Sequence, residues 1–328
     1  MTCKRFLMAS FCTVQIFGAS PIYLFNLGYE APDLVAPAFI LIIPRGQTMN
    51  LQIGIIGWTV MARGEYAFHK YLTVGISQNF TPMNSNASIY RYSDGHRNPD
   101  LDYKNSTQLV ESYIRKKRTR NWTSQYSLIY LNEKVKDTDY DSFWEKPHAG
   151  ISATETWRSV EYEDFFNNRW DGFKLAGQIQ MFPWGHSWYR GKLSAGFGLL
   201  SQPWYWKVSG KLFFSENLNV VNQFIVGGLW ELEPLNFMQG SHYGEYRIDE
   251  GLLFNVMADR KLTEATELGA RMSLLRAGNE SYFGYGLKMI TIYEGIVLNV
   301  GLSISDKALK NRDLNNLIFA TSLTFGFM

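Results

Sequence analysis

Hydrophobic and polar residues alternate with a period of two along much of this chain. The clearest stretch runs from Trp170 to Glu231, where three runs at 173–181, 189–199 and 206–214 carry apolar side chains at every second position. Turn-forming residues such as Pro183 and Pro203 separate these runs. Repeated alternation of this kind is typical of antiparallel strands in which only one face is buried. It is also the signature of a transmembrane β-barrel, whose strands face lipid on one side and the lumen on the other.

The same pattern elsewhere predicts an all-β, antiparallel barrel of about 14 strands. The predicted strands lie at 38–43, 51–68, 71–80, 122–134, 148–158, 173–181, 189–199, 206–214, 218–230, 246–258, 266–274, 282–292, 296–304 and 315–327. An even number places both termini on one side of the membrane, which in bacterial barrels is the periplasm. If the irregular pair at 122–158 merges or is lost, the pattern predicts about 12 strands instead.

The predicted connections differ in length. Long external loops are expected at 81–121 and 232–245, with further loops at 159–170 and 306–314. Tight turns are expected at 69–70, 184–187, 215–217, 259–261 and 293–295, although the connection at 201–203 is a short exception and 135–147 a long one. Short turns at one end and long loops at the other are typical of outer-membrane barrels.

Aromatic residues make up 16% of the chain, including 10 Trp and 19 Tyr, and they gather near the predicted strand ends. Tryptophan and tyrosine favour the interface between membrane and water, so two belts of them would account for this excess. The candidate interface residues are Phe68, Tyr71, Trp184, Trp188, Trp204, Trp206, Trp230, Tyr282 and Tyr293.

The two ends of the chain have the features expected of targeting signals. Lys4 and Arg5 followed by an apolar run to Gly18 predict a secretory signal peptide over 1–20, the alternative being a short buried segment. A periplasmic segment at 21–35 and the barrel at 36–328 would follow. The last strand, with Phe325 and Phe327, resembles the C-terminal signal of bacterial outer-membrane proteins, although Met328 follows it. The resemblance implies recognition by the barrel-assembly machinery of a Gram-negative outer membrane.

Two further features bear on whether the apolar face of the strands contacts lipid or is buried in a soluble core. The only cysteines, Cys3 and Cys12, fall in the predicted signal peptide, so disulfides are not expected in the mature chain. The longest apolar run, 34–43, is too short for a membrane helix. The alternative fold is a soluble antiparallel barrel or sandwich, in which the apolar rows face inward.

Motifs for catalysis or metal binding are weak. Asp137, Asp139 and Asp141 open with calcium-loop spacing, but Ser142 and His148 replace the glycine and the acidic ligand that such a loop requires. The five histidines share no ligand spacing, and no hydrolase or phosphate-binding motif is present. We therefore expect no enzymatic activity, no cofactor and no metal. A net charge of +2 gives no reason to expect a nucleic-acid partner.

Basic residues recur on the non-lipid side of the predicted strands. They are Lys174, Arg190, Lys192, Lys207, Lys211, Arg271 and Lys288. A basic wall in a lumen attracts anions, although these side chains can instead pair with carboxylates such as Glu267 or Asp249. The basic run at 115–120 is expected to be a solvated loop, a contact with lipopolysaccharide or an inward constriction.

The sequence thus predicts an outer-membrane channel, similar to a porin, for small and possibly anionic solutes. Outer-membrane lipid, lipopolysaccharide and small solutes are the expected partners. The alternative is a non-conducting surface barrel with a structural or ligand-binding role. The turn Phe182-Pro183-Trp184 and the entry at 37–46 resemble barrels associated with exopolysaccharide export, and such a barrel belongs to this alternative.

Overall fold

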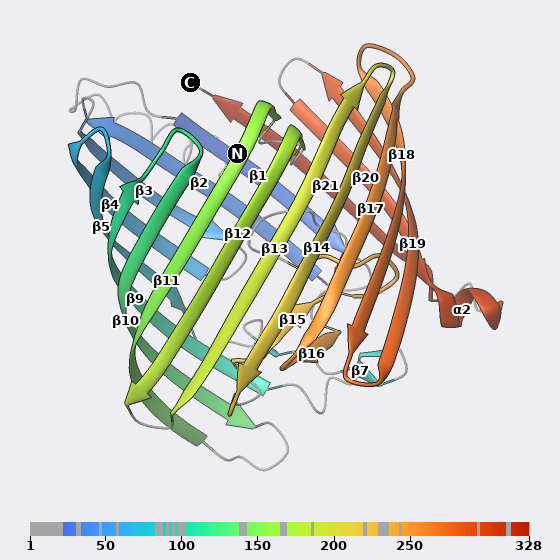
Figure 1. Ribbon diagram of the computed structural model, residues 1–328. Helices are drawn as coiled ribbons and strands as arrows, with labels where there is room; N and C mark the ends of the chain where they lie inside the picture. The colour runs from blue at the N-terminus through green and yellow to red at the C-terminus, as the bar shows by residue number, and fades with distance from the viewer. Residues whose placement is uncertain are drawn as a thin grey trace, which may run out of the picture.

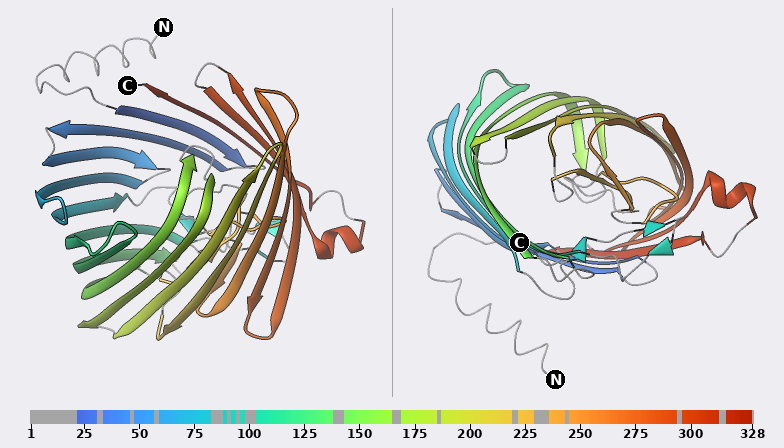
Figure 2. Two further views of the ribbon diagram at one scale, coloured as in Figure 1. Left: turned by 45° about the horizontal axis from the view of Figure 1, so that its top comes forward. Right: turned by 90° about the horizontal axis from the view of Figure 1, so that it is seen from below.

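The computed structural model describes residues 22–30, 34–45, 48–56, 59–82, 88–89, 92–93, 96–97, 103–137, 143–164, 169–184, 187–218, 222–228, 236–242, 245–293, 296–312 and 316–327. One antiparallel sheet dominates them and curves around a lumen (Figures 1 and 2). It has 17 strands, counting the two-residue strand β6.

The wall strands are β1 (Ile22–Glu30), β2 (Leu34–Arg45), β3 (Met49–Ile56), β4 (Thr59–His69), β5 (Leu72–Thr81), β9 (Tyr103–Lys117), β10 (Trp122–Asp137), β11 (Phe143–Asp164), β12 (Arg169–Trp184), β13 (Trp188–Ser201), β14 (Trp204–Glu216), β17 (Gly251–Lys261), β18 (Thr266–Ala277), β19 (Glu280–Tyr293), β20 (Ile296–Ser305) and β21 (Ile318–Phe327). The shorter elements are β6 (Ser88–Ile89), β7 (Tyr92–Ser93), β8 (His96–Arg97), β15 (Phe224–Val226), β16 (Tyr246–Ile248) and α2 (Asp306–Lys310). Among the described residues, no helix has both the length and the apolar character needed to cross a membrane.

Each wall strand pairs with the next wall strand along the chain, and the first strand also pairs with the last. Phe25 of β1 lies opposite Phe39 of β2 on one side and Phe325 of β21 on the other. The view along the axis shows the resulting ring of strands around an interior that is partly filled (Figure 2, right).

The prediction of about 14 strands was too low, and four errors account for the difference. The predicted strand 51–68 is the hairpin of β3 and β4. β1 occupies most of the segment 21–35 that was predicted to precede the barrel, and β9 lies inside the predicted loop 81–121. The described residues of 218–230 contribute the short β15, which pairs with β16 away from the wall. β9 was missed because its inward row, Glu111, Tyr113 and Arg115, is polar and its alternation is weak.

The two ends of the barrel have different connections. The start of β1 and the end of β21 share one end with the connections 46–48, 70–71, 118–121, 165–168, 202–203, 262–265 and 294–295. The other end carries the longer connections 82–102, 217–250 and 306–317, together with short ones such as 185–187 and 278–279. We call these the short-turn end and the long-loop end. The predicted turn at 184–187 therefore lies at the long-loop end, and the predicted loop 159–170 shrinks to a short connection.

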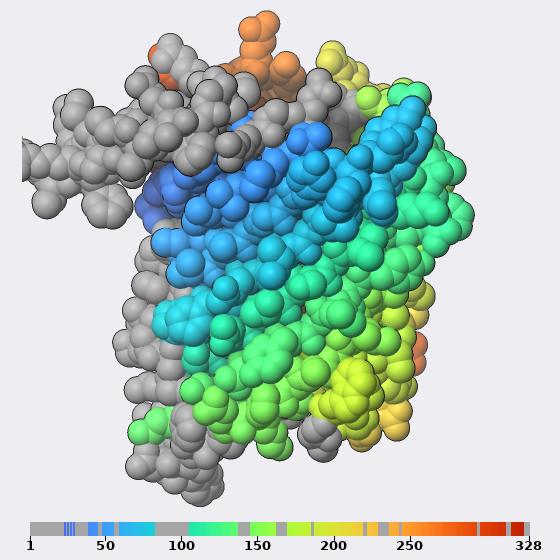
Figure 3. All heavy atoms as spheres, turned by 90° about the vertical axis from the view of Figure 1, so that its left-hand side faces the viewer, coloured from blue at the N-terminus to red at the C-terminus, as the bar shows by residue number. Residues whose placement is uncertain are grey.

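Apolar side chains face outward and polar or small ones inward. In β19, Leu287 is 57% exposed, whereas Gly286 and Lys288 on either side of it are less exposed. In β14, Trp206 is 44% exposed, but its neighbour Lys207 is only 2% exposed. This arrangement is the reverse of the soluble alternative, in which the apolar rows would line the core. The outer surface over the N-terminal strands is a continuous, slanted sheet of side chains (Figure 3).

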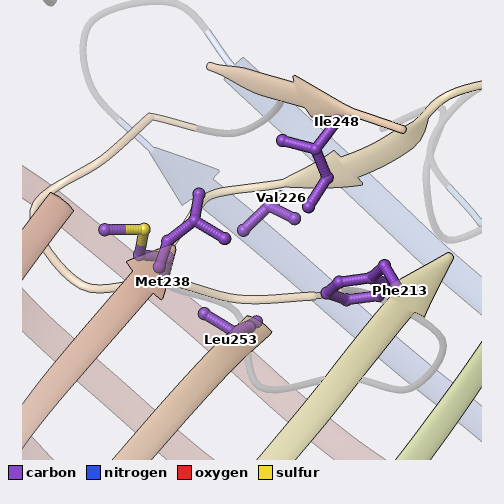
Figure 4. Close-up of a cluster of buried hydrophobic side chains, with 6 residues drawn as sticks. Phe213, Val226, Met238, Ile248 and Leu253 are labelled. Atoms are coloured by element: carbon purple, nitrogen blue, oxygen red, sulfur yellow. The ribbon is translucent and has the colours of Figure 1, made fainter. Parts of the chain in front are cut away.

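The interior contains its own apolar core. Part of the connection from β14 to β17 folds into the lumen, where β15 and β16 pair and pack against the wall (Figures 2 and 4). The buried cluster consists of Phe213, Val226, Met238, Ile248, Leu253 and Leu275. The prediction that 232–245 is an external loop is therefore wrong for 236–242. These residues lie inside because apolar side chains such as Met238 are buried there rather than exposed to water.

Candidate functional site in the lumen

Four of the predicted basic residues line one cavity inside the barrel. Lys174, Lys192, Lys207 and Lys211 come from the neighbouring strands β12, β13 and β14 and face a space of about 290 Å³. Hydroxyl and amide groups, including those of Thr154, Ser194 and Gln178, complete its polar lining, and its apolar lining includes the aromatic rings of Trp170 and Phe237. None of the described residues that line this cavity is acidic, so its described wall is basic.

Trp170 organises the cavity. The ammonium groups of Lys174 and Lys207 lie 4.2 and 4.1 Å from the centre of its indole ring, where the negative face of the ring attracts cations. Gly196 and Gly198 of β13 make room for this residue, because a Cβ atom at Gly198 would lie 1.9 Å from the Trp170 carbonyl oxygen. These two glycines in a central strand are the sequence signal for Trp170, which was not predicted as a site residue.

The other three predicted basic residues have different surroundings. The Arg190 guanidinium donates to Gln180 Oε1 at 2.8 Å and to the Asn222 carbonyl oxygen at 2.9 Å, so it holds the inward loop. Arg271 forms an ion pair with Asp259. Lys288 is half-buried on the inward side of β19. The structure thus brings four of the seven residues together and gives Arg190 and Arg271 structural partners.

The inward loop, which we define as residues 217–250, is anchored on several wall strands. Asn222 Nδ2 donates to Glu133 Oε2 at 3.0 Å on β10, and Lys211 Nζ donates to Asn236 Oδ1 at 3.2 Å from β14. The Gln239 backbone N–H donates to Ser273 Oγ at 3.0 Å on β18. At Gly284 of β19 a Cβ atom would lie 1.6 Å from the Gln239 carbonyl oxygen, so the loop backbone rests on the wall there. The described parts of the loop, 222–228 and 236–242, therefore contact several wall strands from inside and narrow the lumen.

An ionic cluster of Arg169, Asp259, Glu267 and Arg271 lies near the short-turn end. Asp259 of β17 accepts a hydrogen bond from Arg169 at 2.6 Å and also pairs with Arg271 of β18. Arg169 additionally pairs with Glu267. Since β13 and β14 separate β12 from β17 in the sheet, this cluster ties together strands that are not neighbours.

The predicted interface aromatics divide into two groups. Phe68, Tyr71, Trp184, Trp204, Trp206 and Tyr293 are exposed on the outside, all but Trp184 toward the short-turn end. Trp188 is 3% exposed and stacks on Phe182 inside the barrel, and Tyr282 packs on Tyr246 beside the interior cluster. Both therefore face the lumen, because their positions fall on the inward parity of β13 and β19. Trp230 lies outside the described residues.

The predicted assembly signal lies in the last strand. Phe325 and Phe327 belong to β21, where their backbones pair with Phe25 and Tyr23 of β1.

We expect Glu245 to make the inward loop sensitive to pH. Its carboxylate accepts a hydrogen bond from the His242 backbone N–H at 2.8 Å, and burial raises its pKa from 4.5 to about 7. The raised pKa favours the neutral acid, so the contribution of this group to the packed loop is complete below about pH 4.5, falls as the pH rises, and is lost by about pH 7. We expect hydrogen exchange in 236–242 and 245–248 to increase between about pH 4.5 and 7, after correction for intrinsic rates, and to level off above pH 7. In Glu245→Gln the corrected exchange should be flat, and an unchanged pH profile would refute this role.

Among the described residues, no group of three or more His, Cys, Asp or Glu side chains is gathered closely enough to hold a metal ion.

Comparisons with known proteins identify the fold. No family model and no curated protein matches this chain. Among solved structures, BamA from Haemophilus ducreyi lacking POTRA domains 1–3 superposes with a TM-score of 0.70 at 9% identity, covering 94% of this chain and 70% of that one. CdiB from Escherichia coli gives 0.62 at 11% identity, covering 94% and 63%. CdiB from Acinetobacter baumannii gives 0.59 at 11% identity, covering 94% and 60%. At these identities the likeness concerns the fold, and the chain is a β-barrel structurally similar to BamA and CdiB.

Proposed function

We propose that this protein is an outer-membrane barrel through which small anionic solutes pass beside the inward loop. The exposed apolar rows support the membrane location, because such a surface is stable against acyl chains and costly in water. The barrel fold shared with BamA and CdiB supports it as well. The start of β1 and the end of β21 lie together at the short-turn end, which in this proposal faces the periplasm.

The basic cavity is the observation that carries the channel proposal. Four lysines around one space of about 290 Å³ raise the local concentration of anions and lower the barrier to their passage. The inward loop contributes Asn236 and Phe237 to the surroundings of the same cavity, so a solute that passes here meets the loop and the wall together.

Reversing the charge of the cavity should reverse ion selectivity. We expect the wild type to favour chloride over potassium in a planar bilayer, and the triple variant Lys192→Glu, Lys207→Glu, Lys211→Glu to favour potassium, because the sign of the local potential changes. The reversal potential in a KCl gradient measures this directly. The matched control replaces the exposed Lys70, Lys117 and Lys261 with Glu. It changes the net charge equally and should leave the preference for chloride intact. An unchanged reversal potential in the cavity variant would refute the channel proposal.

The inward loop also favours a second candidate, a barrel that binds at its surface and does not conduct. The apolar cluster of Figure 4 buries loop side chains against the wall, as expected for a fixed plug. Single-channel recording separates the two candidates. A stable open level in the wild type supports the channel, whereas silence from a well-inserted barrel supports the plugged, surface-binding barrel.

A further inference from the structure

A polar cluster interrupts the apolar outer face of the barrel. Glu155 lies on β11 with the same parity as Ile151 and Trp157, which are 45% and 37% exposed on the outside, whereas His148 and Ser152 of opposite parity are buried inside. Glu155 therefore points away from the lumen. An ionisable side chain on a lipid-facing surface is costly unless a partner holds it, so such a residue calls for a functional account.

The neighbouring side chains hold the Glu155 carboxylate in place. The Trp122 indole N–H donates to Oε2 at 2.6 Å, the Ser124 hydroxyl donates to Oε2 at 2.7 Å, and the Tyr126 hydroxyl donates to Oε1 at 3.1 Å. Charge-assisted hydrogen bonds of this kind fix both position and ionisation.

A guanidinium lies on the far side of the same hydroxyls. Arg118 donates from Nε to Ser124 Oγ and from a terminal nitrogen to Tyr126 at 3.0 Å, and it also lies 5.7 Å from the centre of the Trp122 ring. The hydroxyl groups of Ser124 and Tyr126 thus form one layer between the Arg118 guanidinium and the Glu155 carboxylate. Arg118 keeps N–H groups beyond those two bonds, since a guanidinium has five donors.

The register adds a second cation and a recess. Lys116 lies directly opposite Ser124 in the pairing of β9 and β10, and it is exposed. Gly177 lies directly opposite Glu155 in the pairing of β11 and β12, where a Cβ atom would meet only Leu193. The outer surface therefore has a recess on the β12 side of the carboxylate and a lysine on its β9 side.

The cluster lies at the short-turn end of the barrel, where exposed aromatic residues also gather. Arg118 lies in the connection between β9 and β10, and Trp122 begins β10, so both are at the short-turn end. The exposed aromatics Phe68, Tyr71 and Tyr293 lie toward the same end, as an interfacial belt requires.

We propose that this notch, formed by Lys116, Arg118, Trp122, Ser124, Tyr126 and Glu155, binds the headgroup of an aminophospholipid of the phosphatidylethanolamine type. The proposal rests on the membrane location proposed above. The lipid phosphate contacts Arg118 and Lys116, and the primary ammonium contacts Glu155 across the recess at Gly177. A phosphate and an ammonium joined by a short ethylene spacer match a cation and an anion held apart by one hydroxyl layer.

The same chemistry rejects other headgroups. Phosphatidylcholine carries three methyl groups on its nitrogen and has no N–H to donate to Glu155. Phosphatidylglycerol has the phosphate but lacks the cation, so the negative charge of Glu155 repels its headgroup with no ammonium to offset the repulsion. The site is therefore selective for a primary amine.

The test compares retained lipids by native mass spectrometry of the full chain, purified in detergent and exposed to equal amounts of phosphatidylethanolamine, phosphatidylcholine and phosphatidylglycerol. We expect the wild type to retain phosphatidylethanolamine about tenfold better than either other lipid. Glu155→Gln should lose this preference and retain phosphatidylglycerol as well as phosphatidylethanolamine. Arg118→Gln should lose retention of both. The matched control Arg120→Gln changes an exposed cation of the same turn and should behave as the wild type.

Two outcomes would overturn the proposal: equal retention of the three lipids by the wild type, or an unchanged preference in Glu155→Gln. A shift between folded and boiled samples on an SDS gel checks that each variant is a folded barrel. If the wild type inserts into vesicles but shows no lipid preference, the headgroup site is wrong and the membrane location stands. If it fails to insert at all, the proposed function itself fails.

Discussion

Replacing Asp259 by Asn is expected to lower the free energy of unfolding by about 3–5 kcal/mol, because it removes one partner of a buried ionic cluster and leaves the other charges behind. The Asp259 side chain is 2% exposed, and those of its partners Arg169 and Arg271 are 10% and 2% exposed. Asparagine keeps the size of the side chain but not its charge. Two buried guanidinium groups would then lose the carboxylate that joins them, and Arg169 would keep its ion pair with Glu267, whose side chain is 19% exposed.

The position of this cluster adds to the expected effect. Arg169 begins β12, whereas Asp259 and Arg271 lie on β17 and β18, beyond β13 and β14. Breaking the cluster therefore loosens a sector of five strands rather than one pair. Urea unfolding in lipid vesicles, followed by tryptophan fluorescence, measures the change. Glu250→Gln, at an exposed position at the long-loop end, is the matched control and should change stability by no more than about 0.5 kcal/mol. A loss below about 1 kcal/mol in Asp259→Asn would show that the cluster does not hold the wall together.

Removing residues 222–242 and joining the ends by a Gly-Ser linker is expected to raise single-channel conductance on the order of tenfold, because barrels of 16–18 strands without a filling enclose a water-filled channel. In the intact protein this part of the inward loop covers Ser273 and the inward glycines of β19. Its removal exposes the basic cavity to the whole lumen.

Two comparisons make this experiment specific. Shortening the connection 306–317, which carries α2 away from the wall in Figure 1, is the control and should leave conductance unchanged. Gly284→Val disturbs the seat of the loop without deleting anything, since its Cβ atom would overlap the Gln239 carbonyl. It should give frequent transitions to a larger open level. Equal conductance in the wild type and the loop deletion would contradict the proposal that solutes pass beside the inward loop.

The sequence alone predicted most of the wall and part of the cavity. Alternation placed Lys207 and Lys211 inside and Trp206 outside on β14, because the side-chain period of a strand fixes the face once its position is known. It also placed Lys174 and Lys192 on the same wall. Short local patterns determine these features, so one sequence is sufficient for them.

The remaining features depend on contacts between distant parts of the chain. The run 218–230 has the composition of a wall strand, but Val226 within it packs against Phe213 and Leu253 inside the barrel. Trp188 was predicted at the interface because it follows a turn, yet the register of β13 with β12 points it toward Phe182. The notch at Glu155 needs three strands in register, and alternation along any one of them does not show it.

The most direct test of the central claim is a cysteine scan along β19. Cys3 and Cys12 are the only natural cysteines, so after their replacement by Ser each introduced thiol can carry a single spin label. In lipid vesicles, labels at 283, 285, 287 and 289 should collide with dissolved oxygen, which concentrates among acyl chains. Labels at 284, 286, 288 and 290 should collide weakly with it. If the labels at 283, 285, 287 and 289 instead collide with a water-soluble nickel complex as often as the labels at the positions between them, the apolar rows do not face lipid. Both the membrane location and the channel are then wrong.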